Sequence, residues 1–202
     1  MAEPVKPYKL DAIKPWPYTN FGKPGTVASR EEVSDLGVTL VKFDNGVKLT
    51  VKPLPTNKDL ISVRVRIGRG RLQMPTNVID ASDMGLSLWS SGGLGKLTPT
   101  EQFRSLAGRR AGVVARTLDD AYALDNMNVA TREDFGLQME IMAATLTDPA
   151  YRKDDWASWM QGADAADTSL NMTPSGVLER ELDRLLHSGD LRWTINTKAM
   201  RD

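Results

Sequence analysis

Apolar and polar residues alternate strictly between positions 61 and 67 of this 202-residue chain. The apolar positions are Ile61, Val63, Val65 and Ile67, and the residues between them are Ser62, Arg64 and Arg66. Successive side chains of a β-strand point to opposite faces, so we expect a strand with one buried apolar face and one exposed arginine face. Such a strand belongs in a sheet that is covered by other elements on one side.

Two hairpins are expected to supply further antiparallel strands. Residues 38–43 and 47–51 flank Asp44-Asn45-Gly46, and Asn-Gly adopts the positive φ that a tight hairpin turn requires. Residues 112–117 and 120–129 form the second predicted hairpin, around Leu118-Asp119.

Five helices are predicted from apolar periodicity and end signals: residues 80–91, 98–107, 131–147, 153–170 and 173–188. Thr98-Pro99-Thr100-Glu101 is a capping box with proline at the first helical position. In the last helix the leucines are expected to face inward and the charged residues outward. These leucines are Leu178, Leu182, Leu185 and Leu186.

The order of elements is strands, two helices, strands and then three helices, which predicts an α+β fold. We expect a two-layer domain, an antiparallel sheet with helices packed on one face. Residues 1–37 are expected to form an extended, proline-rich linker, held on the domain by Trp16, Tyr18 and Phe21. Residues 38–202 would form the domain, truncated at its C-terminal end.

Composition excludes several kinds of site. The chain has 26 basic and 26 acidic residues, so its formal net charge of zero argues against a nucleic-acid partner. No apolar run approaches the roughly 20 residues of a membrane-spanning helix. The absence of cysteine excludes disulfides and thiolate metal sites, and His187 is the single histidine.

Ordered landmarks make residues 38–151 and a late helix similar to a domain of the pitrilysin/insulinase metallopeptidases. No landmark is specific alone, but their order and spacing resemble the family. The landmarks are Phe43-Asp44-Asn45-Gly46-Val47, Val63 to Gly70, Gly85-Leu86, Leu106-Ala107-Gly108, Asp120-Ala121-Tyr122, Leu146 to Tyr151 and Glu179-Arg180-Glu181-Leu182.

The resemblance implies a non-catalytic domain, because the family's inverted zinc motif, His-x-x-Glu-His, is absent. Where that motif would lie, the chain reads Leu88-Trp89-Ser90-Ser91, and residues 155–170 offer Asp164 and Asp167 but no glutamate as a distal ligand. We therefore carry over no catalytic residue and no metal ligand, and expect no cofactor in this chain.

The family also implies a parent protein and a location. The closest resemblance is to large bacterial members exported to the periplasm, in which this chain would be the first domain of the C-terminal half. The implied partners are a zinc-bearing N-terminal half, which would carry out metalloendopeptidase chemistry, and a peptide substrate. An alternative is a catalytically silent structural or assembly domain of the same fold.

Three features of the sequence have competing interpretations. Arg64 and Arg66 are candidate substrate-facing residues, but the same pattern fits a solvated strand face or contact with an acidic partner domain. His187 is expected to interact with carbonyl groups at a helix end. Gly92–Thr98 has some likeness to a phosphate-binding loop but fits a helix stop and turn better, because Ser90 and Leu97 break the phosphate-loop pattern.

Overall fold

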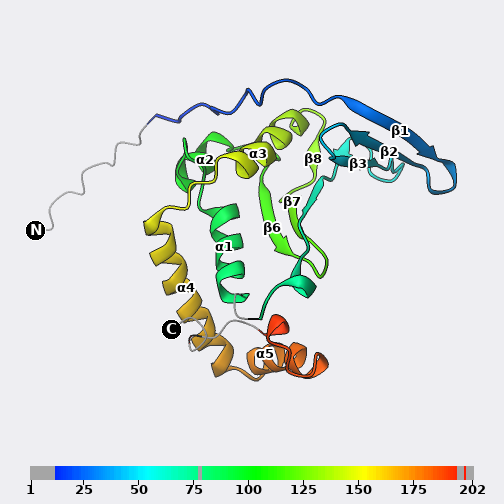
Figure 1. The fold of residues 1–202 in the computed structure, drawn as a ribbon. Coiled ribbons are helices and arrows are strands. Elements are labelled where there is room, and N and C mark those ends of the chain that lie inside the picture. The colour runs from blue at the N-terminus through cyan, green and yellow to red at the C-terminus, as the bar shows by residue number, and fades with distance from the viewer. Residues whose placement is uncertain (1–11, 77–78, 195–197, 199–202) are drawn as a thin grey trace, which may run out of the picture.

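A three-stranded antiparallel sheet forms the centre of the molecule (Figure 1). The computed structural model describes residues 12–76, 79–194 and 198. The strand order is β5 (Arg64–Ile67), β7 (Tyr122–Asn126) and β6 (Val113–Thr117). The alternation between 61 and 67 therefore produces a strand at the edge of this sheet, but a shorter one than expected, since it begins at Arg64 and Ile61 belongs to another strand. The apolar face of β5 is only partly buried, because Ile67 is 40% exposed. Arg64 lies opposite Asp125, and Ile67 lies opposite Tyr122.

The predicted β6–β7 hairpin is present, and Gly70 closes against it. The N–H of Arg71 donates to the carbonyl of Leu118 at 2.8 Å, at the start of a short 3₁₀ helix, η2 (Arg71–Gln73). Gly70 has φ +67°, and a Cβ there would lie 2.2 Å from the nitrogen of Ala121. Only glycine allows this close approach.

The core lies between the sheet and α3 (Phe135–Thr147), around Val113, Leu124, Ile141 and Met142. Gln138 of α3 is fully buried. Its side-chain amide donates to the carbonyl of Gly112, and its side-chain oxygen accepts from the N–H of Gly112, both at 3.0 Å. One polar side chain in the core thus ties α3 to the chain just before β6.

The helices begin and end close to the predicted positions. They are α1 (Ile79–Ser91), α2 (Pro99–Ser105), α3, α4 (Lys153–Met172) and α5 (Pro174–Leu186). The capping box at Thr98 and Glu101 is formed. α3 starts four residues after Thr131, because residues 132–134 form a turn in which the Thr131 hydroxyl accepts from the N–H of Asp134. The N–H of Gly92 bonds to the carbonyl of Leu88, and the segment that follows is the expected turn.

A second three-stranded sheet, here called the arm, projects from the body (Figure 1). It contains the predicted hairpin of β2 (Val38–Phe43) and β3 (Lys48–Val51), joined by β1 (Val27–Val33), which the sequence analysis did not predict. Between the arm and the central sheet, β4 (Leu60–Ile61) pairs with β8 (Ala130–Thr131). The fold class is α+β with antiparallel pairing, as expected, although the strands form three small sheets.

Residues 12–26, here called the strap, run irregularly along the body, as proline predicts. Trp16 and Tyr18 pack against it, while Phe21 is exposed, so two of the three expected aromatics hold the strap. The hydroxyl of Tyr18 donates to Asp148 Oδ2 at 2.6 Å and accepts from the N–H of Lys96 at 2.9 Å. Residues 1–11 of the predicted linker lie outside the described residues.

The expectation that the leucines of α5 face inward is wrong. Leu178, Leu185 and Leu186 are 61%, 68% and 69% exposed, and Leu182 is 45% exposed. α5 packs on α4 through its N-terminal turn, where Gly176 lies against Leu170. Figure 1 shows α4 running along the side of the body to α5, which lies at the end away from the arm. The exposed fractions show that the described chain leaves the leucine face largely uncovered. Among the described residues, no helix is long and apolar enough to cross a membrane.

Candidate functional site

The arginines predicted to face substrate lie on the exposed face of the central sheet, each beside a carboxylate. Arg64 donates two hydrogen bonds to Asp125, at 2.7 and 2.8 Å, and Arg66 binds Asp120 at 2.6 Å. Arg116 of β6 approaches Asp125 at 3.3 Å. The hydrogen bond from Arg64 is the main reason that the pKa of Asp125 lies below its usual value. Asp125 is therefore charged at neutral pH.

This pairing limits what the arginine face can do. An arginine paired with a carboxylate has its positive charge largely offset by the neighbouring negative charge, so it attracts an acidic ligand less than an unpaired guanidinium would. Arg64 and Arg66 remain half exposed, with side-chain exposures of 53% and 51%. Contact with a substrate stays a prediction for both residues, and the structure adds that any such contact competes with Asp125 and Asp120.

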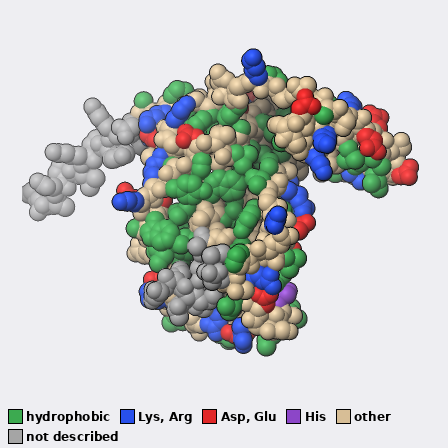
Figure 2. Space-filling model, viewed as in Figure 1, with side chains coloured by type: hydrophobic (Ala, Val, Ile, Leu, Met, Phe, Trp, Pro, Cys, Tyr) green, Lys and Arg blue, Asp and Glu red, His purple; other side chains and the backbone are tan. Residues whose placement is uncertain are grey.

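An apolar pocket, which the sequence analysis missed, lies on the opposite side of the sheet, between the sheet and α1. Its volume is about 290 Å³. The lining residues are Ile67, Ser82, Gly85, Leu86, Trp89, Tyr122 and Tyr151. Figure 2 shows hydrophobic side chains gathered in the centre of one face, over α1. Two lining hydroxyls contact each other, since Ser82 Oγ and Tyr122 Oη are 2.9 Å apart, and the indole N–H of Trp89 donates to the carbonyl of Thr145 at 2.7 Å.

Tyr151, which borders the pocket, has the unusual backbone φ of +47°. Non-glycine residues in this region cost about 1–3 kcal/mol and persist where neighbouring contacts determine them. Here the N–H of Ala150 bonds to the carbonyl of Gly93, and Arg152 donates to the carbonyls of Gly92 and Leu94 at 2.8 and 2.6 Å. Partial burial raises the pKa of the Tyr151 hydroxyl. The backbone at Tyr151 is thus held from both sides by contacts of its chain neighbours.

The donor set does not fit a catalytic zinc. α1 contains neither histidine nor glutamate. Within residues 12–76, 79–194 and 198, no three His, Cys, Asp or Glu side chains are grouped so that they could hold a metal ion. We derive no metal-dependent step for this chain.

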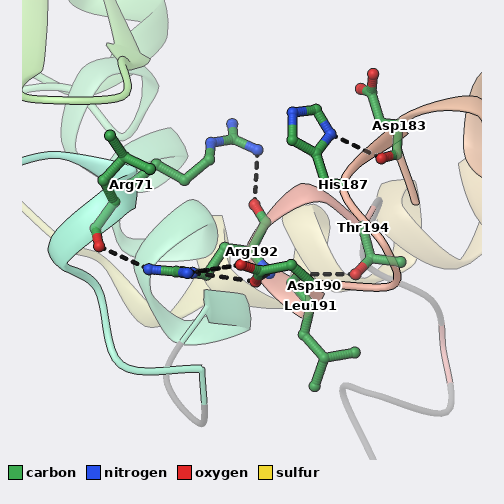
Figure 3. Close-up of polar contacts among 8 residues, drawn as sticks. Arg71, Asp183, His187, Asp190, Leu191, Arg192 and Thr194 are labelled. Atoms are coloured by element: carbon green, nitrogen blue, oxygen red, sulfur yellow. Dashed lines mark hydrogen bonds and ion pairs between the residues drawn. The ribbon is translucent and has the colours of Figure 1, made fainter. Parts of the chain in front are cut away.

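His187 is placed at the end of α5, as expected, with Nδ1 2.8 Å from the carbonyl oxygen of Asp183. Its ring stacks on Trp193 at 3.8 Å, and the guanidinium of Arg71 lies 4.9 Å from the centre of the Trp193 ring. Figure 3 shows the polar contacts of this region, where Arg71 donates to the carbonyl of Arg192 at 2.8 Å. The cluster joins η3 (Leu191–Trp193) to η2 and has a structural role.

Sequence reasoning could find the arginine face but not the pocket. Arg64 and Arg66 are marked by their position in an alternating strand. Ser82, Tyr122 and Tyr151 come from three separate elements, and no spacing in the sequence relates them. The sequence marked only one part of the pocket, the consecutive residues Gly85 and Leu86 within a predicted helix.

Comparisons with family models and with curated protein sequences found no match. Among solved structures, the periplasmic protease PqqL from Escherichia coli is similar over 98% of this chain, with a TM-score of 0.70 and 14% identity. The ferredoxin protease FusC, in complex with Arabidopsis ferredoxin, is similar over 100%, with a TM-score of 0.71 and 12% identity. A protease from Helicobacter pylori is similar over 73%, with a TM-score of 0.59 and 16% identity.

The chain spans 22% of the PqqL and FusC chains and 35% of the Helicobacter pylori chain. Identities this low relate the proteins by fold alone. The chain therefore has the α+β fold of a domain of these proteases.

Proposed function

We propose that this chain is a non-catalytic domain of a zinc-dependent metalloendopeptidase of the pitrilysin/insulinase type. The domain would help to enclose and bind a peptide, while zinc chemistry resides in the N-terminal half of the parent protein. The observation that carries the proposal is the combination of a protease-domain fold over the whole chain with an α1 that lacks every ligand of the inverted zinc motif.

The surfaces of the domain support a role in binding. The central sheet presents a charged face, with Arg64 and Arg66, and an apolar pocket on the side of α1. No arrangement of nucleophile and base accompanies either surface in the described chain, so the geometry favours holding a polypeptide over cleaving one. We further propose a periplasmic location, which the description of PqqL as a periplasmic protease supports.

Zinc content and peptidase activity test the proposal directly. This chain, after dialysis against a chelator and then zinc, is assayed alone and with the N-terminal half of its parent on a mixed peptide pool. We expect no stoichiometric zinc and no cleavage by the chain alone, and faster cleavage when it is added to the zinc-bearing half. Stoichiometric zinc with cleavage by this chain alone would overturn the assignment of chemistry to the other half.

The arginine face is tested with a matched pair of variants. Arg66→Gln removes a guanidinium from the sheet face, whereas Arg132→Gln removes one from an exposed ion pair with Asp59. If the sheet face meets substrate, only the first variant raises the KM for acidic peptides in the mixed assay. Equal KM values for both variants and the unsubstituted chain would exclude this face from substrate binding.

A structural or assembly role is the second candidate function. It is favoured by the exposed leucines of α5, because large contiguous apolar surfaces mark interaction sites. This role is distinguished in the same experiment. If the parent's N-terminal half forms a complex with this chain but cleaves no peptide in the pool, the assembly function replaces the peptidase function.

A further inference from the structure

The pocket between α1 and the sheet owes its depth to Gly85. A Cβ built on Gly85 would meet no atom within 4 Å, so the helix surface is hollow at this point. Leu86 and Trp89 form the helix side of the hollow, and Ile67 and Tyr122, which are paired across β5 and β7, form the sheet side. No charged side chain lines it, so the pocket suits an uncharged apolar group.

The hydroxyl pair gives the pocket one hydrogen-bond donor to offer. Ser82 and Tyr122 share a single hydrogen bond of 2.9 Å, in which one hydroxyl donates and the other accepts. The accepting hydroxyl keeps its own proton. In the part of the chain that the structure describes, no further hydrogen bond involves either group, so this proton is available to an oxygen of a ligand.

The pocket is large enough for one bulky side chain. Sites for drug-sized ligands range from roughly 300 to 1,000 Å³, and this pocket, at about 290 Å³, lies at the lower limit of that range. Tyr151 borders it from a backbone position that its neighbours hold, so an aromatic residue is present at one wall of the pocket. A preformed apolar hollow with one donor at its side matches a bulky side chain whose adjoining backbone carbonyl accepts a hydrogen bond.

We propose that this pocket is a subsite for one bulky, uncharged apolar side chain, aromatic or branched aliphatic, of a bound polypeptide. The inference rests on the proposed peptide-binding function and deepens it, by naming the residue class that the domain selects. Selection arises because a charged side chain would lose its hydration without a partner, and a small one would leave the hollow unfilled.

The test measures binding of labelled peptides to the full chain by fluorescence anisotropy. The host is a Gly/Ser-rich peptide of 11 residues, and its central position is Phe, Leu, Ala or Lys. We expect the Phe and Leu peptides to bind at least about 10-fold more tightly than the Ala and Lys peptides. Adding or removing one methylene group of a ligand in an apolar pocket already changes affinity by about 10–200-fold.

Two glycine variants show where the preference arises. Gly85→Leu adds a side chain at the pocket, where a Cβ meets no atom within 4 Å, and Gly136→Leu makes the same change on α3, where a Cβ also meets no atom within 4 Å. Leucine favours a helix more than glycine does, so neither variant is expected to unfold the chain, and thermal melting checks this. Gly85→Leu should abolish the preference for Phe and Leu, while Gly136→Leu should keep it.

Three outcomes would overturn the inference: equal affinity for the four peptides, an undiminished preference in folded Gly85→Leu, or binding of free p-cresol as tight as that of the Phe peptide. The last outcome would make a small molecule the occupant. The experiments distinguish failure of the subsite from failure of the proposed peptidase function. A selective pocket with no stimulation of the N-terminal half refutes the peptidase role alone, and stimulation without selectivity refutes the subsite alone.

Discussion

Removing one hydroxyl from the strap should destabilise the folded chain by a predictable amount. In Tyr18→Phe the ring remains and still packs on Leu94 and Ala144, because phenylalanine has the same apolar body. The change removes the donor to Asp148 at 2.6 Å and the acceptor of the Lys96 N–H at 2.9 Å. The effect therefore reports on the hydroxyl and not on burial of the ring.

The magnitude follows from the charge of the partner. A hydrogen bond to an ionised group contributes about 1.5–3 kcal/mol, and a neutral one about 0.5–1.5 kcal/mol. The N–H of Lys96 is partly exposed and can turn to water, so the carboxylate bond dominates. We expect the free energy of unfolding to fall by about 2 kcal/mol. The Tm should fall by about 4–8 °C, because 1 kcal/mol corresponds to about 2–4 °C in a chain of this size.

The pH dependence provides a second measurement with a definite sign. Burial, followed by the hydrogen bond to Asp148, raises the pKa of Tyr18 from 10.0 to about 12 in the folded chain. Because the pKa is raised on folding, the stabilisation is fully present below pH 10 and is lost as the pH rises through 12. The difference in unfolding free energy between the original chain and Tyr18→Phe should therefore shrink between pH 10 and 12.

Urea unfolding followed by circular dichroism measures the free energy of unfolding and its dependence on pH, and thermal melting measures the Tm. The control is Tyr151→Phe, at a residue that is 53% exposed, and it should change stability by less than about 0.5 kcal/mol, as surface substitutions do. A Tyr18→Phe effect below about 0.5 kcal/mol, or a difference that stays constant from pH 8 to 12, would refute the reasoning.

Three further predictions concern the core, a turn and a surface. Gln138→Met should lower the free energy of unfolding by about 2–4 kcal/mol in urea titrations, because it orphans the buried N–H of Gly112 and removes one bond to its carbonyl. Gly70→Ala should cost about 3 kcal/mol or more, seen as a lower Tm or insoluble protein, because its Cβ would collide with Ala121. Leu185→Lys should change stability by no more than about 0.5 kcal/mol, since the side chain is exposed; a loss above about 2 kcal/mol would show that the leucine is buried after all.

The elements that were predicted best from the sequence are those whose conformation is determined by residues within a few positions of one another. The alternation before Gly68 gave β5, the Asn-Gly turn gave the β2–β3 hairpin, and the Thr98 capping box gave the start of α2. In each case the physical cause acts within a few residues. The likeness of the whole chain to protease domains then followed from the order of such elements and not from any one of them.

The failures share a different cause, which is that burial depends on distant partners. Amphipathic spacing placed the leucines of α5 on one face correctly but could not tell which face the rest of the chain would cover. β1 was missed because its central residues are charged, and it is held by pairing with β2. The pocket could not be predicted because Ser82, Tyr122 and Tyr151 meet only after the sheet, α1 and the end of α3 have come together.

The loop between α1 and α2 is hydrogen-bonded to two other parts of the chain, and this affects how a force on the strap would be transmitted. Tyr18 holds the N–H of Lys96, and Arg152 holds the carbonyls of Gly92 and Leu94. Tyr18 also binds Asp148, at the end of α3. Tension applied along the strap therefore loads α3, the loop and the start of α4 together, before it reaches the arm.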